Sequence, residues 1–438
     1  MRSLRQRLQA YAQEHGPIRV GLVGAGQMGT GLMSQMERMD GMRAVAVADV
    51  VPNRAQAAFG EASVPADLVV CVEESDSDPV GKANEVIAAG KRVATHSADL
   101  LVQIDNLDVI VESTGVPEVG AFVCEAAIRA GKHVVNMNVE ADATIGYLLA
   151  QMAEEAGVVY SLAAGDEPGS IKEMFDFADA LGFEIVMVGK GKNNPLNREA
   201  NPDHVAAKAL AQHMSAKMLA SFVDGTKTMV EMTSIGNATG YAPEVRGAHG
   251  PNCSVKELPK VFVPRADGGI LDGRGAVDYA VGDVAPGVFV IITTDQPKII
   301  TDLNYLRLNG HGGYWALYRP YHLANLETPI TVANVVLDRR ETLATFKRPV
   351  AETIAVAKRD LQPGERVDAL GGYTVYGMIE KTAVSQPEDL LPLGLAVGAE
   401  LVNPVAKGEP LRYSDVVLNE QQAIVRLRRQ QDRLLGYK

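Results

Sequence analysis

The first 165 residues alternate short apolar runs with amphipathic stretches. Four runs, at 18–23, 43–48, 108–112 and 132–136, have the length of strands and are rich in Val, Ile and Ala. Such runs are typical of parallel strands that are buried on both faces. A helical repeat of apolar positions follows the first run, between Gly31 and Met39. The pattern predicts an α/β fold with a doubly wound parallel sheet.

The first run ends in a glycine triplet, Gly24, Gly26 and Gly29, with Gln27 and Met28 inside it. Strand, glycine turn and helix follow one another, which is the order found in Rossmann dinucleotide-binding domains. The second run ends in Asp49, twenty positions after Gly29, where an acid that binds the ribose belongs. We therefore predict a dinucleotide-binding domain over residues 1–165, with these five residues of the turn and Asp49 at the cofactor.

The type of dinucleotide is less well defined by the sequence. Asp49 favours an unmodified ribose, whereas Arg54 can pair with a 2′-phosphate and favours NADPH, with NADH as the alternative. The later strands end in polar residues that we expect on the nicotinamide side: Ser113, Thr114, Gly115 and Asn136. Helix capping is the competing interpretation of these residues.

Composition limits the function classes. The 438 residues suggest about three domains, and 47% hydrophobic residues with 22% charged residues indicate a globular chain. A net charge of −12 argues against nucleic acid as a partner, and no apolar run is long enough for a membrane span. Three scattered cysteines fit a reducing cytoplasm. Residues 1–16 have the pattern of a helix that docks on this protein or on a partner subunit.

The segment 166–321 changes in character and is expected to be the catalytic domain, of α+β class. A predicted strand from Glu184 leads into a glycine-spaced basic loop with Lys190 and Lys192, followed by Asn193 and Asn194. Two lysines two positions apart project to one side of an extended chain and suit a phosphate or an enediolate. A solvated sheet edge is the alternative.

Further polar residues extend this expected site. Lys227 and Glu231 share a face of the helix predicted after Gly225, either as an exposed salt bridge or as a buried pair that faces the substrate. Asn237 would close the same pocket. Near position 320, a possible anion binder and two possible acid/base or contact groups follow one another: Arg319, Tyr321 and His322.

Together these motifs resemble the homoserine dehydrogenase-like oxidoreductases that carry a C-terminal SAF-type domain. The tail supports the resemblance with 356–365, 391–399 and 405–411, which look like the small β-rich SAF fold. The resemblance implies that 322–346 return as a helix to the nucleotide domain, that 347–438 form the SAF-type domain with a C-terminal helix, and that a homodimer forms through the middle domain.

Within that group the chain resembles the 1-deoxy-D-xylulose 5-phosphate reductoisomerase-like enzymes. This implies isomerisation of a phosphorylated hydroxyketone followed by reduction with NADPH, assisted by Mg²⁺ or Mn²⁺. Lys190, Lys192, Glu231 and His322 would then be catalytic. The substrate would be held by Asn193, Asn194, Lys227, Asn237, Arg319 and Tyr321. No ligand-spaced cluster marks the metal, for which Glu231 and Asp166 are candidates.

One departure from homoserine dehydrogenases supports an anionic substrate. Where their helix carries an aspartate and then a lysine, this chain has Lys227 and then Glu231. Two other functions remain open. One is an NAD(P)-dependent dehydrogenase of another small hydroxy acid, sugar or sugar phosphate, with Lys190 or Lys192 as acid/base. The other is a non-catalytic NAD(P)-binding sensor.

Overall fold

The computed structural model describes residues 3–193, 195–212 and 214–437. The chain forms two compact units. Unit 1 contains the residues up to Asp166 together with Leu323–Ala344, and unit 2 contains Glu167–His322 together with the residues from Thr345 onward. Neither unit is continuous in sequence.

Unit 1 is built on a seven-stranded sheet in the order β3-β4-β2-β1-β5-β6-β7. All six strand pairs are parallel, which confirms the predicted doubly wound sheet. The strands are β1 (Ile18–Val23), β2 (Met42–Ala48), β3 (Val69–Cys71), β4 (Arg92–Thr95), β5 (Val109–Glu112), β6 (His133–Asn136) and β7 (Tyr160–Leu162). Almost every residue of β1, β2 and β5 is buried, as their apolar sequences require.

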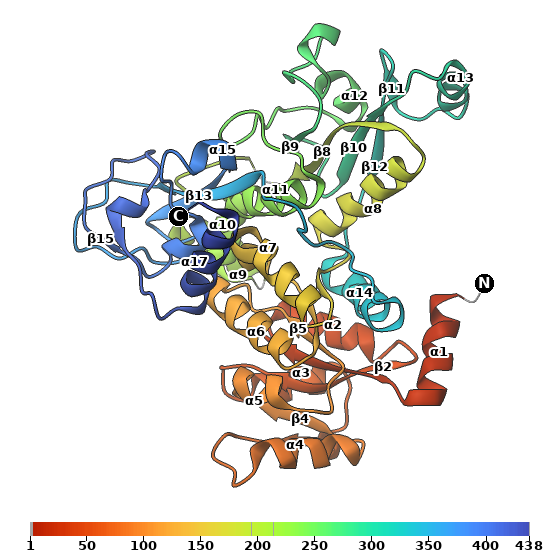
Figure 1. Ribbon diagram of the computed structural model, residues 1–438, viewed down its shortest axis with the longest axis vertical. Coiled ribbons are helices and arrows are strands. Elements are labelled where there is room, and N and C mark those ends of the chain that lie inside the picture. Colours follow the sequence, from red (N-terminus) through yellow and green to blue (C-terminus); the bar gives the residue numbers. More distant parts are fainter. Residues whose placement is uncertain (1–2, 194, 213, 438) are drawn as a thin grey trace. The chain divides into compact units, whose positions relative to one another are not determined.

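The helices of unit 1 form two packed groups. α14 (Ala324–Asp338) and α3 (Arg54–Glu61) each contact α2 (Gln27–Met36), while α6 (Pro117–Arg129) contacts α5 (Ala98–Gln103) and α7 (Val139–Glu155). Figure 1 shows that α14, drawn in cyan, comes from a distant part of the chain. α1 (Leu4–His15) buries Leu8 in the unit's core. Of the two expected docking surfaces, this protein or a partner subunit, the helix therefore uses this protein. α4 (Pro79–Ala88) completes the unit.

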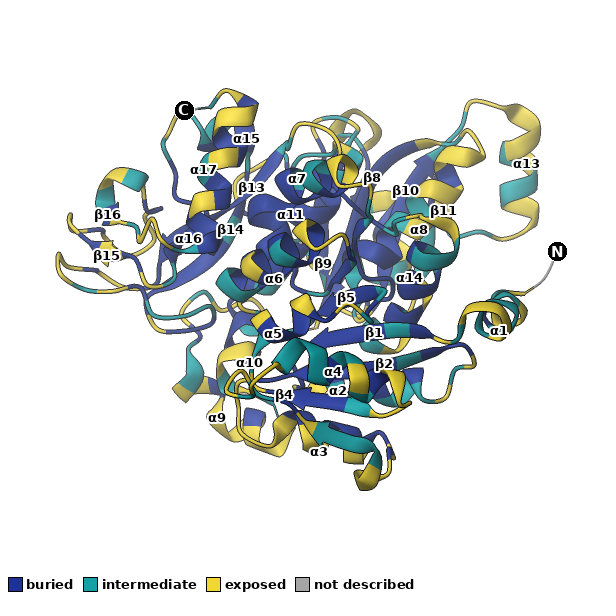
Figure 2. Ribbon diagram, turned by 60° about the horizontal axis from the view of Figure 1, so that its bottom comes forward, coloured by how far each residue is buried: buried dark blue, intermediate teal, exposed yellow. Residues whose placement is uncertain are grey.

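Unit 2 contains a mixed sheet in the order β11-β12-β10-β8-β9, with β8 and β9 parallel and the other pairs antiparallel. Its strands are β8 (Glu184–Lys192), β9 (Ala276–Val281), β10 (Val288–Thr293), β11 (Gly310–His311) and β12 (Tyr314–Arg319). α8 (Glu167–Ala180) packs on β8 and β10, and α11 (Thr226–Thr239) packs on α8 and β9. Figure 2 shows α11 in the dark blue of buried residues. The remaining helices here are α9 (Pro202–Ala211), α10 (Ala216–Val223), α12 (Leu258–Val261) and α13 (Pro297–Tyr305).

The C-terminal part of unit 2 is β-rich, as the SAF-type expectation requires. Its main feature is the antiparallel hairpin of β13 (Ala351–Ala357) and β14 (Val375–Lys381), and both strands contact α11. The other elements are β15 (Glu400–Leu401), β16 (Val416–Val417), α15 (Thr382–Ser385), α16 (Leu393–Ala396) and α17 (Ala423–Leu435). Across the described residues, no helix is both long enough and apolar enough to cross a membrane.

One expectation about local structure is wrong. The basic loop expected after the apolar strand is instead the end of β8, which continues to Lys192. Gly189 and Gly191 leave room for the neighbouring backbone. A Cβ on Gly189 would lie 2.6 Å from Asp278 O, and a Cβ on Gly191 would lie 2.2 Å from Ala285 N. The glycines therefore permit close backbone packing on one side of β8, while the lysines use the other side.

Candidate functional site

The glycine turn has the geometry that a pyrophosphate requires. Gly24 has φ 97°, a conformation that favours glycine, and a Cβ on Gly29 would stand 2.0 Å from Gly24 O. Gly26 is exposed, and among the described residues no heavy atom lies within 4 Å of a Cβ built on it. Gln27 and Met28 are exposed at the start of α2, beside free space for a ligand at the helix N-terminus. The residues therefore fit a dinucleotide.

Asp49 lies at the carboxyl end of β2, directly beside this turn. Its Oδ2 accepts the Ala25 N–H at 2.8 Å and its Oδ1 accepts the Val51 N–H at 2.9 Å. Arg54 is half exposed, and its Nη1 is 3.7 Å from Asp49 Oδ1. The carboxylate thus anchors the glycine turn to β2, while the half-exposed guanidinium of Arg54 lies at the edge where a ribose would bind.

The predicted nicotinamide-side residues divide into two groups. Ser113, Thr114 and Gly115 are partly exposed after β5, and Ser113 Oγ donates to Gly24 O at 2.8 Å. Asn136 was expected beside them, but it is fully buried and its Nδ2 donates to Asn138 O and to the Tyr160 hydroxyl. Those bonds use its amide inside the core, where it supports the ends of β6 and β7, so direct contact of Asn136 with a cofactor stays a prediction.

Glu112 ends β5 underneath these residues. Its Oε1 accepts the Thr114 N–H at 2.8 Å and also the Thr114 hydroxyl. Complete burial raises the pKa of Glu112 to about 7, although the Thr114 bonds act in the opposite direction. A titrating carboxyl therefore supports the turn after β5.

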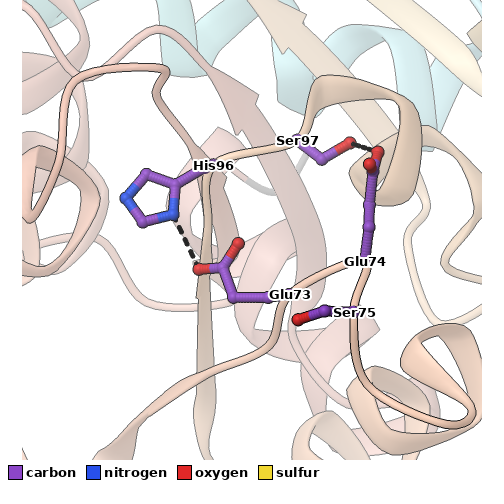
Figure 3. Close-up of a pocket in the computed structure, with 5 residues that line it drawn as sticks. All are labelled: Glu73, Glu74, Ser75, His96 and Ser97. Atoms are coloured by element: carbon purple, nitrogen blue, oxygen red, sulfur yellow. Dashed lines mark hydrogen bonds and ion pairs between the residues drawn. The ribbon is translucent and has the colours of Figure 1, made fainter.

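An open pocket of about 530 Å³ also belongs to unit 1, where β3 and β4 end (Figure 3). His96 Nδ1 is 2.8 Å from Glu73 Oε1, and Ser97 Oγ donates to Glu74. The Asp49 N–H donates to Thr95 O, which connects this edge to the glycine turn. Two carboxylates make the pocket unsuitable for an anion, and it is not part of the polar cluster of unit 2 described next.

In unit 2, β8, α8 and α11 bring three charged groups together. Lys190 Nζ on β8 donates to Glu167 Oε1 at 2.5 Å, at the start of α8, and to Glu231 Oε2 on α11. His322, just after β12, places Nε2 3.4 Å from the same Glu167 oxygen. Side-chain exposure decreases from 20% for His322 to 12% for Glu167, 7% for Lys190 and 2% for Glu231. The four groups form a polar path from a partly exposed histidine into the interior.

The charges of this cluster are unequal. Burial disfavours the Lys190 ammonium, but the two carboxylates outweigh burial and hold the pKa of Lys190 above its ordinary value. Burial and the charge of Glu167 raise the pKa of Glu231 to about 7, even though the ammonium groups of Lys190 and Lys227 lower it. The pKa of Glu231 is thus raised although its carboxylate contacts an ammonium, because burial and the neighbouring carboxylate together outweigh that contact.

Arg319 ends β12, and Tyr321 lies between it and His322. Arg319 Nη1 is 3.3 Å from Ser170 Oγ and 3.2 Å from Glu173 Oε2, and its guanidinium lies over the Tyr321 ring at 4.7 Å. Tyr321 is 50% exposed. Ser170 and Glu173 follow Glu167 on α8, so Arg319 contacts the same helix that carries Glu167.

Lys192 is two positions beyond Lys190 and is also buried. Its Nζ donates to Phe222 O at 2.9 Å. Burial and the charge of Lys190 lower the pKa of Lys192 to about 8, with Asp224 opposing and Arg198 adding to the effect. Asn193 is exposed directly after β8, and Asn194, the other predicted substrate amide, lies outside the described residues.

The structure gives partners to two predicted residues of α11. The ion pair of Glu231 is with Lys190, and Lys227 acts on Glu231 through its charge one turn away. Asn237 bonds to backbone groups: its Oδ1 accepts the Val350 and Ala351 N–H groups and its Nδ2 donates to Ala351 O. These bonds tie the amide to the start of β13, so the observed contacts of Asn237 are structural and its substrate role stays a prediction.

Glu167 is the central residue that the sequence did not single out as a site residue. The available signal was the turn Gly165-Asp166-Glu167-Pro168, which opens a helix directly after a strand. The helix begins at Glu167, so this carboxylate lies in the first turn of α8. Nothing local in the sequence indicates that it faces Lys190.

Three family models match consecutive parts of the chain. Residues 24–163 match the NAD-binding domain of homoserine dehydrogenase, 165–328 match the catalytic domain of oxidoreductase DRL, and 352–417 match the SAF domain. No curated relative matches the sequence. With the geometry of the glycine turn, these matches define the class of the protein as an NAD(P)-dependent oxidoreductase with a C-terminal SAF domain.

Solved structures resemble the chain only distantly. A probable dehydrogenase from Thermotoga maritima is 14% identical, with 74% of this chain and 90% of that chain covered and a TM-score of 0.42. A scyllo-inositol dehydrogenase from Lactobacillus casei, with bound NAD(H) and scyllo-inositol, is 15% identical with the same coverage and a TM-score of 0.41. Likeness at this level carries no argument about the substrate.

Proposed function

We propose that the protein transfers a hydride between NAD(P)H and the oxo or hydroxyl carbon of a small anionic polyhydroxy compound. The buried Lys190 between Glu167 and Glu231 is the observation that carries this proposal. A charged group that is desolvated and doubly paired is characteristic of sites that stabilise developing charge.

The residues of unit 2 would divide the chemistry between them. The Lys190 ammonium is held in its charged form, so it can stabilise the negative charge that develops on the substrate oxygen. Glu231, with a pKa of about 7, can give or take the proton of that oxygen near neutral pH. The path through Glu167 to the partly exposed His322 would then restore the proton.

The glycine turn of unit 1 would hold the dinucleotide, which supplies the hydride when bound. Gly26 would admit the pyrophosphate, and Gly24 and Gly29 would keep β1 and α2 close enough for the helix N–H groups to face it. Arg54 beside Asp49 supports NADPH as the preferred form, with NADH as the alternative.

Cations near the cluster support an anionic substrate. The charges of Lys190 and Lys192 act on one another, and Lys227 acts on Glu231. Arg319 adds a planar donor that suits carboxylate or phosphate oxygens. Lys227 and Arg319 are the groups we expect to contact the substrate's charged end.

A second candidate is the reductoisomerase reaction on 1-deoxy-D-xylulose 5-phosphate, which the anion-binding charges also suit. That reaction implies Mg²⁺ or Mn²⁺. Glu167 and His322 can offer ligand atoms, with Asp166 as the preceding residue of the chain. However, the Glu167 oxygen nearest His322 is the one that Lys190 occupies, so this donor set does not fit an octahedral ion as it stands. We derive no step through a metal.

The test is NADPH and NADH oxidation by the purified protein with a panel of small oxo acids, ketoses and sugar phosphates, including 1-deoxy-D-xylulose 5-phosphate, with and without Mg²⁺ or Mn²⁺. Metal-independent turnover of an anionic oxo compound supports the dehydrogenase. Metal-dependent formation of 2-C-methyl-D-erythritol 4-phosphate supports the second candidate. Cofactor binding without turnover of any compound would contradict both and favour a sensor.

A further inference from the structure

Helix α11 is held between two different neighbours. Three polar side chains on one stripe bind the β13–β14 hairpin of the C-terminal segment. Thr226 Oγ1 accepts the Gly377 N–H at 2.9 Å, and Thr233 Oγ1 shares a 2.8 Å hydrogen bond with Thr353 Oγ1. Asn237 completes the stripe with its bonds to residues 350 and 351. The spacing of these residues, 7 and 11 positions from Thr226, is that of one helix face.

Glu231 projects from a different side of the same helix. Its carboxylate pairs with Lys190 of β8, and its side chain is 2% exposed. The position of this carboxylate therefore depends on how α11 is fixed by the hairpin.

The helix start is fixed by a buried acid. Asp224 is 0% exposed, and its Oδ1 accepts the Thr226 N–H at 2.8 Å, across Gly225 with φ 87°. Burial raises the pKa of Asp224, whereas the charge of Lys358 lowers it. An isolated carboxylate at such a place would take up a proton, because ionisation without water is costly.

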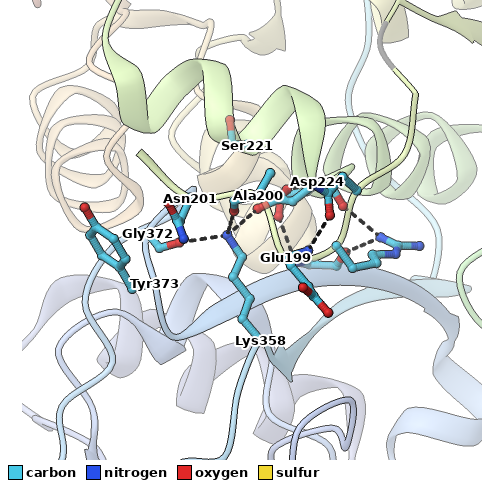
Figure 4. Close-up of polar contacts among 12 residues, drawn as sticks. Glu199, Ala200, Asn201, Ser221, Asp224, Lys358, Gly372 and Tyr373 are labelled. Carbon is cyan, nitrogen blue, oxygen red and sulfur yellow. Dashed lines mark hydrogen bonds and ion pairs between the residues drawn. The ribbon is translucent and has the colours of Figure 1, made fainter. Parts of the chain in front are cut away.

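Lys358 directly follows β13 and pairs with this acid (Figure 4). Its Nζ is 2.8 Å from Asp224 Oδ2 and donates to Ala200 O at 2.5 Å and Gly372 O at 2.7 Å. The ammonium therefore contacts one carboxylate and two carbonyl oxygens, which come from three chain segments. The ammonium is buried, with 3% of its side chain exposed.

We propose that Lys358, from the segment matched by the SAF domain, is a positioning residue for Glu231. Its ammonium compensates the buried charge of Asp224, whose Oδ1 binds the first turn of α11, and the hairpin then sets the helix side that carries Glu231. This proposal rests on the proposed function in one respect, which is that Glu231 takes part in turnover. A displacement of about 1 Å at a reacting group can cost on the order of 100-fold in rate.

The experiment compares Lys358→Met with a matched control, Lys407→Met, in the full chain. Lys407 also links the C-terminal segment to this region through Glu199, next to Ala200, but that pair is exposed at 54% and 59%. We expect Lys358→Met to increase hydrogen exchange at least tenfold in α11 and to leave β10 and the exchange of unit 1 unchanged. It should lower kcat at least tenfold, shift the pH profile near 7, and leave KM for NADPH unchanged. Lys407→Met should change none of these.

A second variant serves as the control if Lys358→Met fails to fold. Lys358→Met with Asp224→Asn removes both buried charges, and the Asn oxygen can still accept the Thr226 N–H, so exchange protection of α11 should return. The proposal is overturned if Lys358→Met leaves α11 exchange unchanged, or if it loosens β10 and α11 equally. Because exchange needs no substrate, these results decide the proposal even if every assayed compound fails, and that failure would count against the proposed function alone.

Discussion

At the scale of single residues, the candidate site depends on one buried ammonium. Lys190 is shared by Glu167, 23 positions before it, and Glu231, 41 positions after it. The sequence predicted Lys190 and Glu231 as site residues, and their roles stay predictions. The sequence pattern placed Lys190 beside Lys192 and Glu231 beside Lys227. The i,i+4 spacing on a helix is visible in a sequence, whereas a contact between β8 and α11 is not.

Replacing Lys190 by Met should lower kcat by about 10²–10⁴-fold, the range of a lost acid/base or charge-stabilising group. The steady-state rate of NADPH oxidation measures this. Lys172→Met is the control, because Lys172 forms an i,i+4 pair with Asp176 on α8 and lies outside the cluster. NADPH affinity, followed by fluorescence, should be the same in both variants. Full activity of Lys190→Met would remove the cluster from the mechanism.

The raised pKa of Glu112 predicts that the free energy of unfolding depends on pH. Its pKa is raised from 4.5 to about 7 in the folded protein, so between these values the unfolded chain loses the proton first. Stability from this group is therefore lost as pH rises through that window. Glu112→Gln cannot ionise and should become more stable relative to the wild type by up to about 3 kcal/mol between pH 4.5 and 8.

Denaturant unfolding at several pH values measures this difference. Gln keeps an oxygen that can accept both Thr114 bonds, so the substitution preserves the turn after β5. Glu61→Gln, at an exposed position of α3, serves as the control and should show a difference that does not change with pH. A constant difference for Glu112→Gln would show that Glu112 does not titrate in this range.

At the scale of elements, two glycines of the glycine turn have different roles, one in cofactor binding and one in folding. In Gly26→Ala the new methyl group meets no described atom of the protein within 4 Å but occupies the pyrophosphate space. Its Tm without cofactor should be unchanged, while Kd for NADPH should rise at least tenfold.

Gly29→Ala should behave differently, because its Cβ would collide with Gly24 O at 2.0 Å. Overpacking of this kind costs about 1–3 kcal/mol, so both Tm and NADPH affinity should fall. Thermal unfolding with and without NADPH compares the two variants. Equal loss of Tm in both would contradict the separate roles of the two glycines.

At the scale of the whole molecule, unit 1 depends on a returning segment. Val332, Ala333 and Val335 of α14 belong to the same buried cluster as Val20 and Leu32. A fragment that ends at Asp166 exposes this part of the core and should not unfold cooperatively. A fragment in which a flexible linker joins Asp166 to Leu323–Ala344 should unfold cooperatively and bind NADPH. Circular dichroism melts and NADPH fluorescence test both fragments, and cooperative melting of the shorter one would contradict this role of α14.

The sequence by itself determined the parallel sheet, its order of strand, glycine turn and helix, and the start of α11 after Gly225. These features follow from the local repeat of apolar residues and from backbone conformations that only glycine adopts easily, so neighbouring residues suffice to predict them.

Only the tertiary structure decided which polar groups share a partner. It brought Glu167 to Lys190, Lys358 to Asp224, and Asn136 and Asn237 to buried backbone groups. A buried polar atom must find a partner wherever the packing of helices on sheets provides one. Those partners come from segments up to 134 positions apart in the case of Asp224 and Lys358 (358 minus 224), and no local pattern in the chain records such a pairing.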